Sequence, residues 1–519
     1  QREGWQHGLD GSALYHYNGT TNITNTTIAG NTEASLIRRL HDQINIASSI
    51  LWNDDTATGG STISFSLVKG HSGTGVINKD PWFVDPDNDD YSLKPGSVCI
   101  NTGHPDAVDE DGTRRDMGRY IHTHTYEGSD WHVSPSGNEL TGDGSSGNPL
   151  SSIQAAVNMA NEGDNVILSE GVYSGFGNSN IYFLGKNLSL SSFGSAEATI
   201  IDLGNVSGNR GFVFEGHNQF PTAGPETVID GITIQNGYLS QSYGYNAGAG
   251  IYIDSASPTF QNCIIKDNYA ELGHDGYING GGIFLYNSSS TFTNCSILNN
   301  TLKGRAGCHN CNSYSRGAGV YVDLSSSGVV TFDDCLISGN INFGDDSSDN
   351  NSSYAHMRGS AFYKQGSGTL NILNSEIINN TMQREGWQHG WYGSALYHYN
   401  GTTNITNTTI KGNEGSSLIR KVYDQINIMN TIIWGNSEHQ VDGATISYSN
   451  VENYSGGTGN ISANPLLDAH ENQNGKFSLQ LDSPCYNAGN PDPIYNDEDG
   501  TRSDMGANGA PSIMNGNAV

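Results

Sequence analysis

The sequence predicts an all-β fold, a parallel β-helix solenoid that contains tandem units. Two repeats of different length lead to this prediction. Residues 1–46 reappear as residues 383–428 at a constant offset of 382, and 37 of the 46 aligned positions are identical. Within residues 236–436 a shorter period appears, in which brief aliphatic runs alternate with Gly, Asn and Ser and each period ends in Asn. Repeats of this kind are typical of solenoid architectures.

The shorter period has the size of one β-helix rung. Its final Asn stands at positions 236, 268, 300, 340, 380, 413 and 436. The shortest step, 23 residues, fits three short strands, and the longer steps fit a rung with an insertion. Because strands bury alternate side chains, one buried level should contain Ile251, Ile283, Val320, Phe362 and Leu396. We expect each final Asn to adopt a positive φ and its amide to bond to the Asn of the next rung.

The longer repeat divides the chain into a partial and a complete unit. The segment DEDGTRRDMG at 109–118 answers to DEDGTRSDMG at 497–506. We therefore expect the C-terminal part of one β-helix unit at 1–118, a linker at 119–130, a complete unit at 131–506 and a linker to a next unit at 507–519. Apolar residues at helical spacing predict a short capping helix at about 150–161, because a solenoid end has exposed strand edges.

These start and end segments carry a family resemblance. The complete unit opens with VSPSGNELTGDGSSGNPLSSIQAAVNMANEGDNVILSEGVY, and the two units close with SVCINTGHPDAVDEDGTRRDMG and SPCYNAGNPDPIYNDEDGTRSDMG. They resemble bacterial secreted right-handed parallel β-helix repeat proteins of the pectate-lyase-like solenoid superfamily, of the multi-unit surface type. The resemblance covers nearly the whole chain. It implies a right-handed β-helix and secretion, but no single function, because this fold carries polysaccharide-cleaving enzymes, adhesins and structural stalks alike.

Composition narrows the class of partner and the location. The formal net charge is -30, which argues against nucleic acid and anionic membranes as partners. No apolar run reaches the length of a membrane-spanning helix, and we expect an extracellular or cell-surface location. Cys263, Cys295 and Cys335 share one repeat position and predict a buried stack. Cys308 and Cys311 predict a local disulfide in an oxidising compartment.

Five insertions follow the recurrent Asn at one place in the rung, at 237–246, 269–279, 301–316, 341–358 and 381–392. Stacked rungs would place them side by side as loops along one edge. Their candidate binding residues are Tyr243, Tyr245, His274, Tyr277, His309, Tyr314, His356, Trp387, His389, Trp391 and Tyr392. Such rings suit glycan or protein partners, and the alternative is that the loops simply pack on one another. A metal site would need the four histidines to align, which their variable spacing does not ensure.

Calcium is the metal that the acidic segments favour. Carboxylates are dense at Asp85, Asp87 and Asp89, and in the paired motifs at Asp109, Asp111, Asp497 and Asp499. Neither pattern matches an EF-hand loop, and the alternative is an acidic turn whose Asp side chains cap backbone amides. No other cofactor is required. We expect Arg114 and Arg502 in these motifs to pair locally with a carboxylate.

Two functions remain open. The first is an extracellular structural or adhesive protein, an elongated stalk or self-assembling filament, whose partners are other copies of itself, head-to-tail or lateral, or surface glycans or proteins. The alternative is a glycan-binding or polysaccharide-cleaving β-helix that uses the loop edge as a groove. We do not expect an enzyme, because basic residues are scarce and no Asp pair recurs on neighbouring rungs as a hydrolase cleft would need.

Overall fold

The computed structural model describes residues 13–31, 36–53, 58–123, 126–216, 222–307, 311–346, 354–386, 391–437, 441–468, 477–497 and 499–507. The chain divides into two units. Unit 1 comprises Gln1–Ser169, Tyr182–Ser189 and Gly216–Thr222, and unit 2 comprises Glu170–Ile181, Leu190–Glu215 and Ala223–Val519. Among the described residues no helix is both long and apolar enough to cross a membrane.

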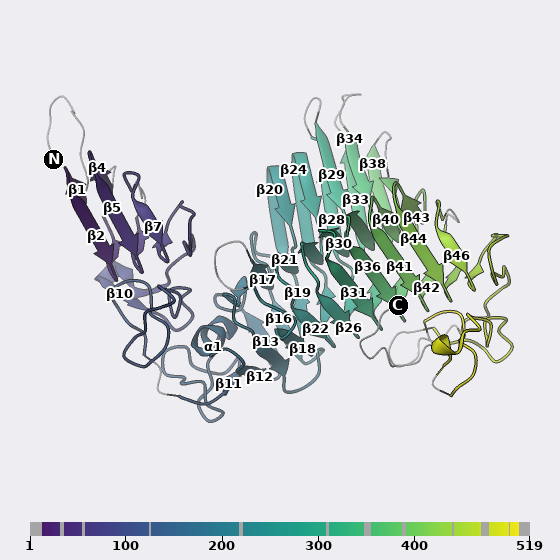
Figure 1. The fold of residues 1–519 in the computed structure, drawn as a ribbon, viewed down its shortest axis with the longest axis horizontal. Helices are drawn as coiled ribbons and strands as arrows, with labels where there is room; N and C mark the ends of the chain where they lie inside the picture. Colours follow the sequence, from purple (N-terminus) through teal and green to yellow (C-terminus); the bar gives the residue numbers. More distant parts are fainter. Residues whose placement is uncertain are drawn as a thin grey trace. The chain divides into compact units, whose positions relative to one another are not determined.

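Three parallel sheets form the body of unit 2 (Figure 1). Sheet A contains β18 (Val228–Asp230), β22 (Thr259–Gln261), β26 (Thr291–Thr293), β31 (Val329–Asp333), β36 (Thr369–Leu373), β41 (Thr402–Thr406), β44 (Gln425–Met429) and β46 (Thr445–Ser447). Sheet B contains β13 (Gly171–Ser174), β16 (Thr199–Asp202), β19 (Thr233–Gln235), β23 (Ile264–Lys266), β27 (Ser296–Leu298), β32 (Leu336–Ser338), β37 (Glu376–Ile378), β42 (Thr409–Lys411), β45 (Ile432–Trp434) and β47 (Asn450–Val451). Sheet C contains β17 (Phe212–Glu215), β21 (Ile251–Asp254), β25 (Ile283–Tyr286), β30 (Val320–Leu324), β35 (Phe362–Gly366), β40 (Leu396–His398) and β43 (Ile419–Lys421).

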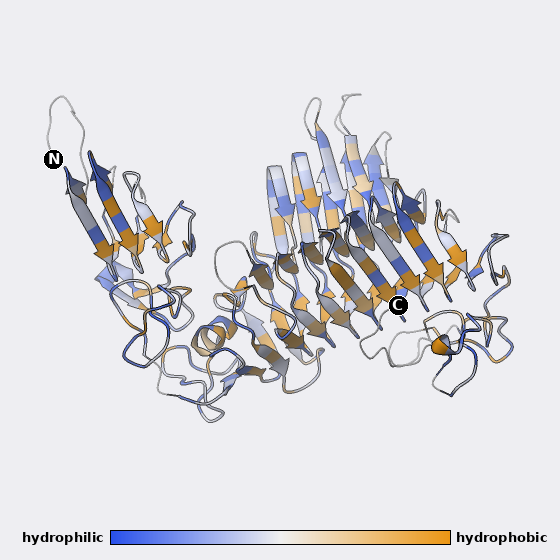
Figure 2. Cartoon of the chain, in the orientation of Figure 1, coloured by the Kyte–Doolittle hydropathy of each residue, from blue (hydrophilic) through white to orange (hydrophobic). Residues whose placement is uncertain are grey.

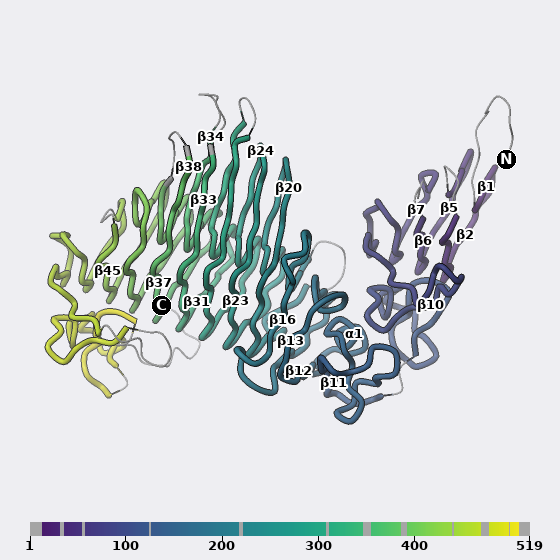
Figure 3. The backbone as a smooth tube through the Cα atoms, turned by 180° about the vertical axis from the view of Figure 1, so that it is seen from behind, coloured from purple at the N-terminus to yellow at the C-terminus, as the bar shows by residue number. Residues whose placement is uncertain are grey.

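The chain visits sheets C, A and B in turn, and each visit lies beside the strand of the previous rung (Figure 3). The level predicted from the sequence is confirmed, because Ile251, Ile283, Val320, Phe362 and Leu396 are register partners from rung to rung and are all buried. The predicted cysteine stack is also confirmed, since its three members are buried free thiols. Hydrophobic and hydrophilic residues alternate along the strands, as Figure 2 shows, because one face of each strand lines the core.

The recurrent Asn forms a buried amide ladder. The Nδ2 atom of Asn268 donates to Oδ1 of Asn300 at 2.9 Å, and the same bond continues from Asn300 to Asn340 at 3.0 Å and from Asn340 to Asn380 at 2.9 Å. The predicted ladder is therefore confirmed, but the predicted positive φ is wrong at most of these Asn residues. The left-handed conformation falls one residue earlier, at Asp267, Asn299, Gly339, Asn379, Gly412 and Gly435. The residue that turns the chain precedes the Asn, which leaves the Asn amide free to point inward.

The five insertions are strands, not the loops that the sequence predicts. They form a fourth parallel sheet, here called the fin, which contains β20 (Tyr238–Ala247), β24 (Tyr269–Asn279), β28 (Thr301–Arg305), β29 (Asn312–Arg316), β33 (Ile341–Asp346), β34 (Tyr354–Arg358), β38 (Thr381–Gly386) and β39 (Trp391–Tyr392). Their side-by-side placement is as expected (Figure 1). The insertions can pair because each begins at the same place in the rung, so their backbones run in register. A small apolar core that includes Leu239, Leu272 and Leu302 supports the base of the fin.

Unit 1 contains the earlier copy of the same rungs. Its parallel strands are β1 (Leu14–His16) with β4 (Ile37–Arg39), β2 (Thr20–Thr24) with β5 (Gln43–Ala47) and β7 (Thr62–Ser64), and β3 (Thr27–Ala29) with β6 (Ile50–Trp52) and β8 (Leu67–Val68). The first six strands in sequence occupy the same positions as β40 to β45 at the offset of 382. The repeated sequence therefore folds alike in both places.

The rest of unit 1 is an antiparallel pair, a helix and a further parallel pair. The antiparallel pair is β9 (Phe83–Asp85) with β10 (Asp90–Leu93), joined by the 3-10 turn η1 (Pro86–Asn88). Strand β11 (Asp130–Val133) pairs with β12 (Asn165–Leu168), and α1 (Ile153–Met159) lies between them in sequence. Helix α1 falls within the predicted segment, and Ser152 caps its first turn by accepting a hydrogen bond from the Ala155 amide. Strands β14 (Ile181–Tyr182) and β15 (Ser189–Ser192) each contain residues of both units, and η2 (Pro493–Tyr495) belongs to unit 2.

Candidate functional site

The fin carries a ladder of aromatic rings along its outer strands. Tyr245, Tyr277, Tyr314 and His356 are successive register partners. The ring centroids of Tyr277 and Tyr314 are 4.9 Å apart, and those of Tyr314 and His356 are 4.7 Å apart, with nearly parallel planes in both pairs. Because Tyr314 is stacked between Tyr277 and His356, both faces of its ring are already in contact, and mainly its edge and hydroxyl group remain for a ligand.

Two arginines join the fin ladder to a second ladder on sheet C. The guanidinium carbon of Arg316 lies 4.5 Å from the Tyr277 ring centroid and 5.4 Å from that of Tyr363. Arg358 lies 5.3 Å from the Tyr397 ring centroid. Tyr363 and Tyr397 are buried and stack with centroids 5.3 Å apart. Cation–π contacts thus pack the fin against the solenoid. Together with the stacked rings within the fin, they are in line with the alternative in which the insertions pack on one another.

The remaining predicted residues of the fin are not gathered at one point. The His274 ring contacts the ring of Tyr243, whereas His356 aligns with Tyr314, so these two histidines lie at different positions. Tyr243, Tyr245 and Tyr392 stay exposed. Trp391 is placed only by its backbone pairing with Met357. His309, Trp387 and His389 lie outside the described residues.

The Cys308–Cys311 pairing stays a prediction. Cys311 is disulfide-bonded, whereas Cys308 lies outside the described residues. The other described cysteines, at positions 99, 263, 295, 335 and 485, are free.

The two acidic end motifs fold in the same way. Asp111 accepts from the amide and hydroxyl of Thr113, and Asp499 accepts from those of Thr501. Asp109 accepts from the amide of Asp116 at 2.7 Å, and Asp497 accepts from that of Asp504 at 3.1 Å. Burial raises the pKa of Asp116 and of Asp497 to about 7 in each case. These carboxylates cap backbone amides, which is the alternative to calcium that the sequence left open.

A calcium site stays a prediction. Among the residues that the structure describes, no group of three or more His, Cys, Asp or Glu side chains is arranged to hold a metal ion. Asp85 of the first acidic segment accepts a hydrogen bond from Asn88 at 2.8 Å, and Asp87 lies in η1 beside it. Asp89 adopts a left-handed conformation with φ of +61° at the end of that turn.

The expected pairing of Arg502 with a carboxylate is wrong, whereas that of Arg114 stays a prediction. Arg114 donates through Nε to the Gly103 carbonyl at 2.8 Å, and Arg502 donates to the Gly489 carbonyl at 2.6 Å. A guanidinium has several donors in one plane, and the neighbouring carbonyls of the tight end motif lie within their reach.

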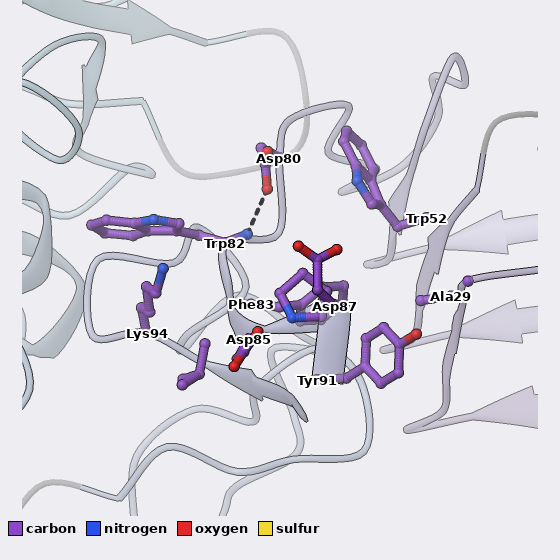
Figure 4. Close-up of a pocket in the computed structure, with 12 residues that line it drawn as sticks. Ala29, Trp52, Asp80, Trp82, Phe83, Asp85, Asp87, Tyr91 and Lys94 are labelled. Atoms are coloured by element: carbon purple, nitrogen blue, oxygen red, sulfur yellow. Dashed lines mark hydrogen bonds between the residues drawn. The ribbon is translucent and has the colours of Figure 1, made fainter. Parts of the chain in front are cut away.

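Unit 1 contains a pocket of about 460 Å³ between β3, β6 and the β9–η1–β10 turn. Figure 4 shows Trp52 and Trp82 on different sides of it, with the Asp87 carboxylate between them. The residues that line it are Ala29, Gly30, Trp52, Asp80, Trp82, Phe83, Val84, Asp85, Pro86, Asp87, Tyr91 and Lys94. A volume of this size suits a small ligand such as one or two sugar rings.

Two glycines leave room for the aromatic side chains that line the pocket. A Cβ atom at Gly96 would lie 1.9 Å from the Trp82 ring, and one at Gly30 would lie 2.5 Å from the Tyr91 hydroxyl. The Trp82 amide donates to Oδ1 of Asp80 at 2.8 Å, which fixes the turn before the indole. Both indoles have a cation beside them. Lys94 Nζ lies 5.7 Å from the Trp82 ring centroid and Lys69 Nζ lies 5.4 Å from that of Trp52.

Unit 2 has the same turn without the same chemistry. Leu466 donates its amide to Asn464 Oδ1 at 3.1 Å, as Trp82 does to Asp80. The Gln480 amide then donates to the Leu466 carbonyl, as the Lys94 amide does to that of Trp82. Leu466, Asn464 and Gln480 of unit 2 therefore stand where unit 1 has Trp82, Asp80 and Lys94.

Sequence reasoning missed the pocket as a binding site. It singled out Asp85 and Asp87 for calcium but passed over Trp52, Trp82 and Lys94. A usable signal was the departure of one repeat copy from the other, with Trp82 where the later copy has Leu466.

Comparisons with known proteins address the fold. The family described as "Right handed beta helix region" matches residues 195–354. The chain folds as a right-handed parallel β-helix. This confirms the predicted fold class and the coarser part of the resemblance. No curated protein matches the chain.

Similar solved structures include two lyases and an esterase. Pectate lyase Pel9A is 16% identical with a TM-score of 0.41, over 73% of this chain and 95% of its own. A rhamnogalacturonan lyase is 13% identical with a TM-score of 0.29, over 68% and 97%. A pectin methylesterase in complex with a hexasaccharide is 12% identical with a TM-score of 0.24, over 58% and 81%. With TM-scores below 0.5, these likenesses support no inference about this chain.

Proposed function

We propose that this protein is an extracellular β-helix protein that binds glycans at the pocket of unit 1. The observation that carries the proposal is the wall chemistry of that pocket. Two indoles, the Tyr91 ring, three carboxylates and one ammonium surround a space of about 460 Å³.

A sugar ring has the matching chemistry. Its C–H face is apolar and packs on an aromatic face, while its hydroxyl groups need acceptors and donors around the ring edge. Asp80, Asp85 and Asp87 supply acceptors, and Lys94 supplies donors.

The fin is the weaker candidate for the same function. The faces of Tyr314 are stacked on Tyr277 on one side and on His356 on the other. A sugar would therefore have to separate stacked rings before it could contact their faces. This supports the pocket, rather than the edge of insertions, as the glycan site.

Glycan binding is tested by titrating the full chain with a panel of oligosaccharides in a calorimeter. We expect Trp82→Leu, which installs the residue that unit 2 has, to weaken binding at least tenfold. The matched control is Trp434→Leu, at the unit 2 position equivalent to Trp52, and it should bind like the unsubstituted chain. Equal affinity of the Trp82→Leu variant and the unsubstituted chain would contradict the proposal. Assaying the same mixtures for new reducing ends and for unsaturated products tests cleavage separately.

We propose a stalk or filament as a second function, supported by the recurrence of one end motif in two units. Other copies of the protein are then the partners, head-to-tail or lateral. Electron micrographs of the purified protein test this, with calcium and after chelation. Filaments with an axial repeat of one unit are expected, and their loss on chelation would assign calcium to the contacts between units. Isolated particles in both conditions would contradict self-assembly.

A further inference from the structure

The end motifs of the two units are the same structure. They comprise residues 95–118 in unit 1, the first end motif, and 481–506 in unit 2, the second end motif, with 498 outside the described residues. The backbone amides of Asn101 and Asn487 donate to Asp116 and Asp504, each at 2.7 Å. The carbonyls of Cys99 and Cys485 accept from the backbone amides of Met117 and Met505, at 2.9 and 3.0 Å. Because the internal bonds match, their surfaces can be compared position by position.

The first end motif is covered by the α1 segment, which comprises residues 130–168 and 182–189 of unit 1. The Asn101 side chain donates to the Asn158 carbonyl at 3.0 Å. The Asn158 side chain donates in return to the Ser97 carbonyl at 2.7 Å and to that of Pro95 at 3.4 Å. Asn158 is fully buried. A polar side chain in the interior keeps its place only if it is hydrogen-bonded, and the end motif supplies those bonds.

The α1 segment completes this contact with its own buried groups. Gln154 bonds Asn158 at 2.9 Å and also both the amide and the carbonyl of Tyr182. Lys186 donates to three carbonyls at the end of α1, those of Val157, Asn158 and Ala160. The surface that meets the first end motif is therefore held rigidly.

In the second end motif the equivalent described residues are exposed. Ile100 is 1% exposed, whereas Tyr486 at the equivalent position is 39% exposed. Asn101 is 7% exposed, whereas its equivalent Asn487 is exposed. Leu481, which stands where unit 1 has the buried Pro95, is 93% exposed. Leu481, Tyr486 and Asn487 are thus exposed at the positions whose equivalents are buried in the first end motif.

We propose that the second end motif is a docking surface for the α1 segment of a further copy of the unit. That copy would be joined in tandem in the same chain, as the α1 segment here follows the first end motif. Asn487 would donate to the carbonyl of that copy's residue equivalent to Asn158. The amide of that residue would donate back to the carbonyls of Ser483 and Leu481. Within this chain the α1 segment is already engaged by the first end motif, which favours a tandem copy over a second separate chain as the donor.

The test uses the full chain and a tandem chain in which residues 131–507 are repeated directly after Val519. Hydrogen–deuterium exchange of residues 481–490 is followed in both proteins. We expect exchange in the tandem chain to slow at least tenfold, towards the rate of residues 95–104. Protection of the Asn ladder in the added copy verifies that this copy is folded. Unchanged exchange at 481–490 beside a folded added copy would overturn the proposal.

A single substitution makes the test specific to the surface. Leu481→Glu places a charge on the proposed contact, and the side chain is exposed enough that the folding of the unextended chain should not change. The protection at 481–490 should disappear from the tandem chain that carries it. Persistent protection in this variant would place the contact elsewhere.

The chain without the added copy tests whether a separate chain, rather than a tandem copy, occupies this surface. If sedimentation at micromolar concentration shows dimers in which residues 481–490 are protected, the partner is a separate chain and the tandem proposal is wrong. This docking rests on the proposed stalk function, for which it would supply the head-to-tail contact. Filaments that assemble laterally would still appear in micrographs if this docking failed. Glycan binding at the pocket does not depend on it.

Discussion

At the scale of single residues, Tyr397 shows how a side chain on the outer face of a strand becomes buried. It stands in the segment LYH of β40 and is 6% exposed. Tyr397 stacks on Tyr363 of the preceding rung and receives the Arg358 guanidinium. A side chain on the outer face of a strand is thus buried by what the neighbouring rungs place beside it.

His398 predicts acid sensitivity of unit 2. Its ring is fully buried and bonds to Thr403 at 2.9 Å, and burial together with the charge of Lys364 lowers its pKa to about 4. The unfolded chain has a His pKa near 6.5, so it binds the proton first as pH falls. Stability from the neutral ring is therefore present above about pH 6.5 and decreases towards pH 4, by at most about 1.4 kcal/mol per pH unit.

The measurement is thermal unfolding at pH 7 and pH 4.5. We expect His398→Leu, which has no proton to gain, to lose less of its midpoint temperature on acidification than the unsubstituted chain. Lys364→Met should act in the same direction, because removing the neighbouring charge lets the His398 pKa rise. An equal decrease in all three proteins would show that His398 does not control acid stability.

At the scale of elements, buried ladders support the solenoid. Phe260, Phe292 and Phe332 stack with centroid distances of 5.0 and 4.6 Å, and the Asn ladder runs beside the fin. Sequence periodicity was sufficient to predict the Asn ladder, because residues one rung apart must become neighbours in a parallel solenoid. It could not predict that the insertions pair as strands, since their sequences lack a shared pattern and their pairing follows from the register of the rungs below.

The Asn ladder predicts a difference between buried and exposed amides. Asn340 is fully buried, receives the Asn300 amide and donates to the Ile297 carbonyl, so Asn340→Ala should destabilise its rungs by about 2–4 kcal/mol. Asn427 ends an exposed ladder with one bond of 2.9 Å to Asn404, and Asn427→Ala should cost under about 1 kcal/mol. Hydrogen exchange of the flanking strands measures both effects. Similar protection in the two variants would contradict a structural role for burial in this ladder.

At the scale of the whole molecule, charge should select among glycans. The formal net charge is -30 and the pocket contributes three carboxylates against one ammonium. Like charges repel over about 10 Å at 0.1 M salt, so anionic polyuronides should bind more weakly than neutral or amino sugars of equal size.

Calorimetric titration at low and at physiological ionic strength measures this preference. Added salt should narrow the difference between the neutral and the anionic ligands, because it screens the repulsion. Tighter binding of an oligogalacturonide at low salt would show that the carboxylates do not face the ligand.

The fold and its repeat units followed from the sequence, because a rung that recurs must stack on itself and bring identical residues together. The site did not follow in the same way. Trp52 and Trp82 lie thirty positions apart in sequence, and the turn at Asp80–Trp82, before β9, helps to place them around one cavity. The contrast between Ile100 and Tyr486 is likewise a tertiary fact, because two end motifs of the same sequence pattern differ in what covers them. Periodicity acts between neighbouring rungs, whereas a pocket or a docking surface depends on contacts between segments that share no period.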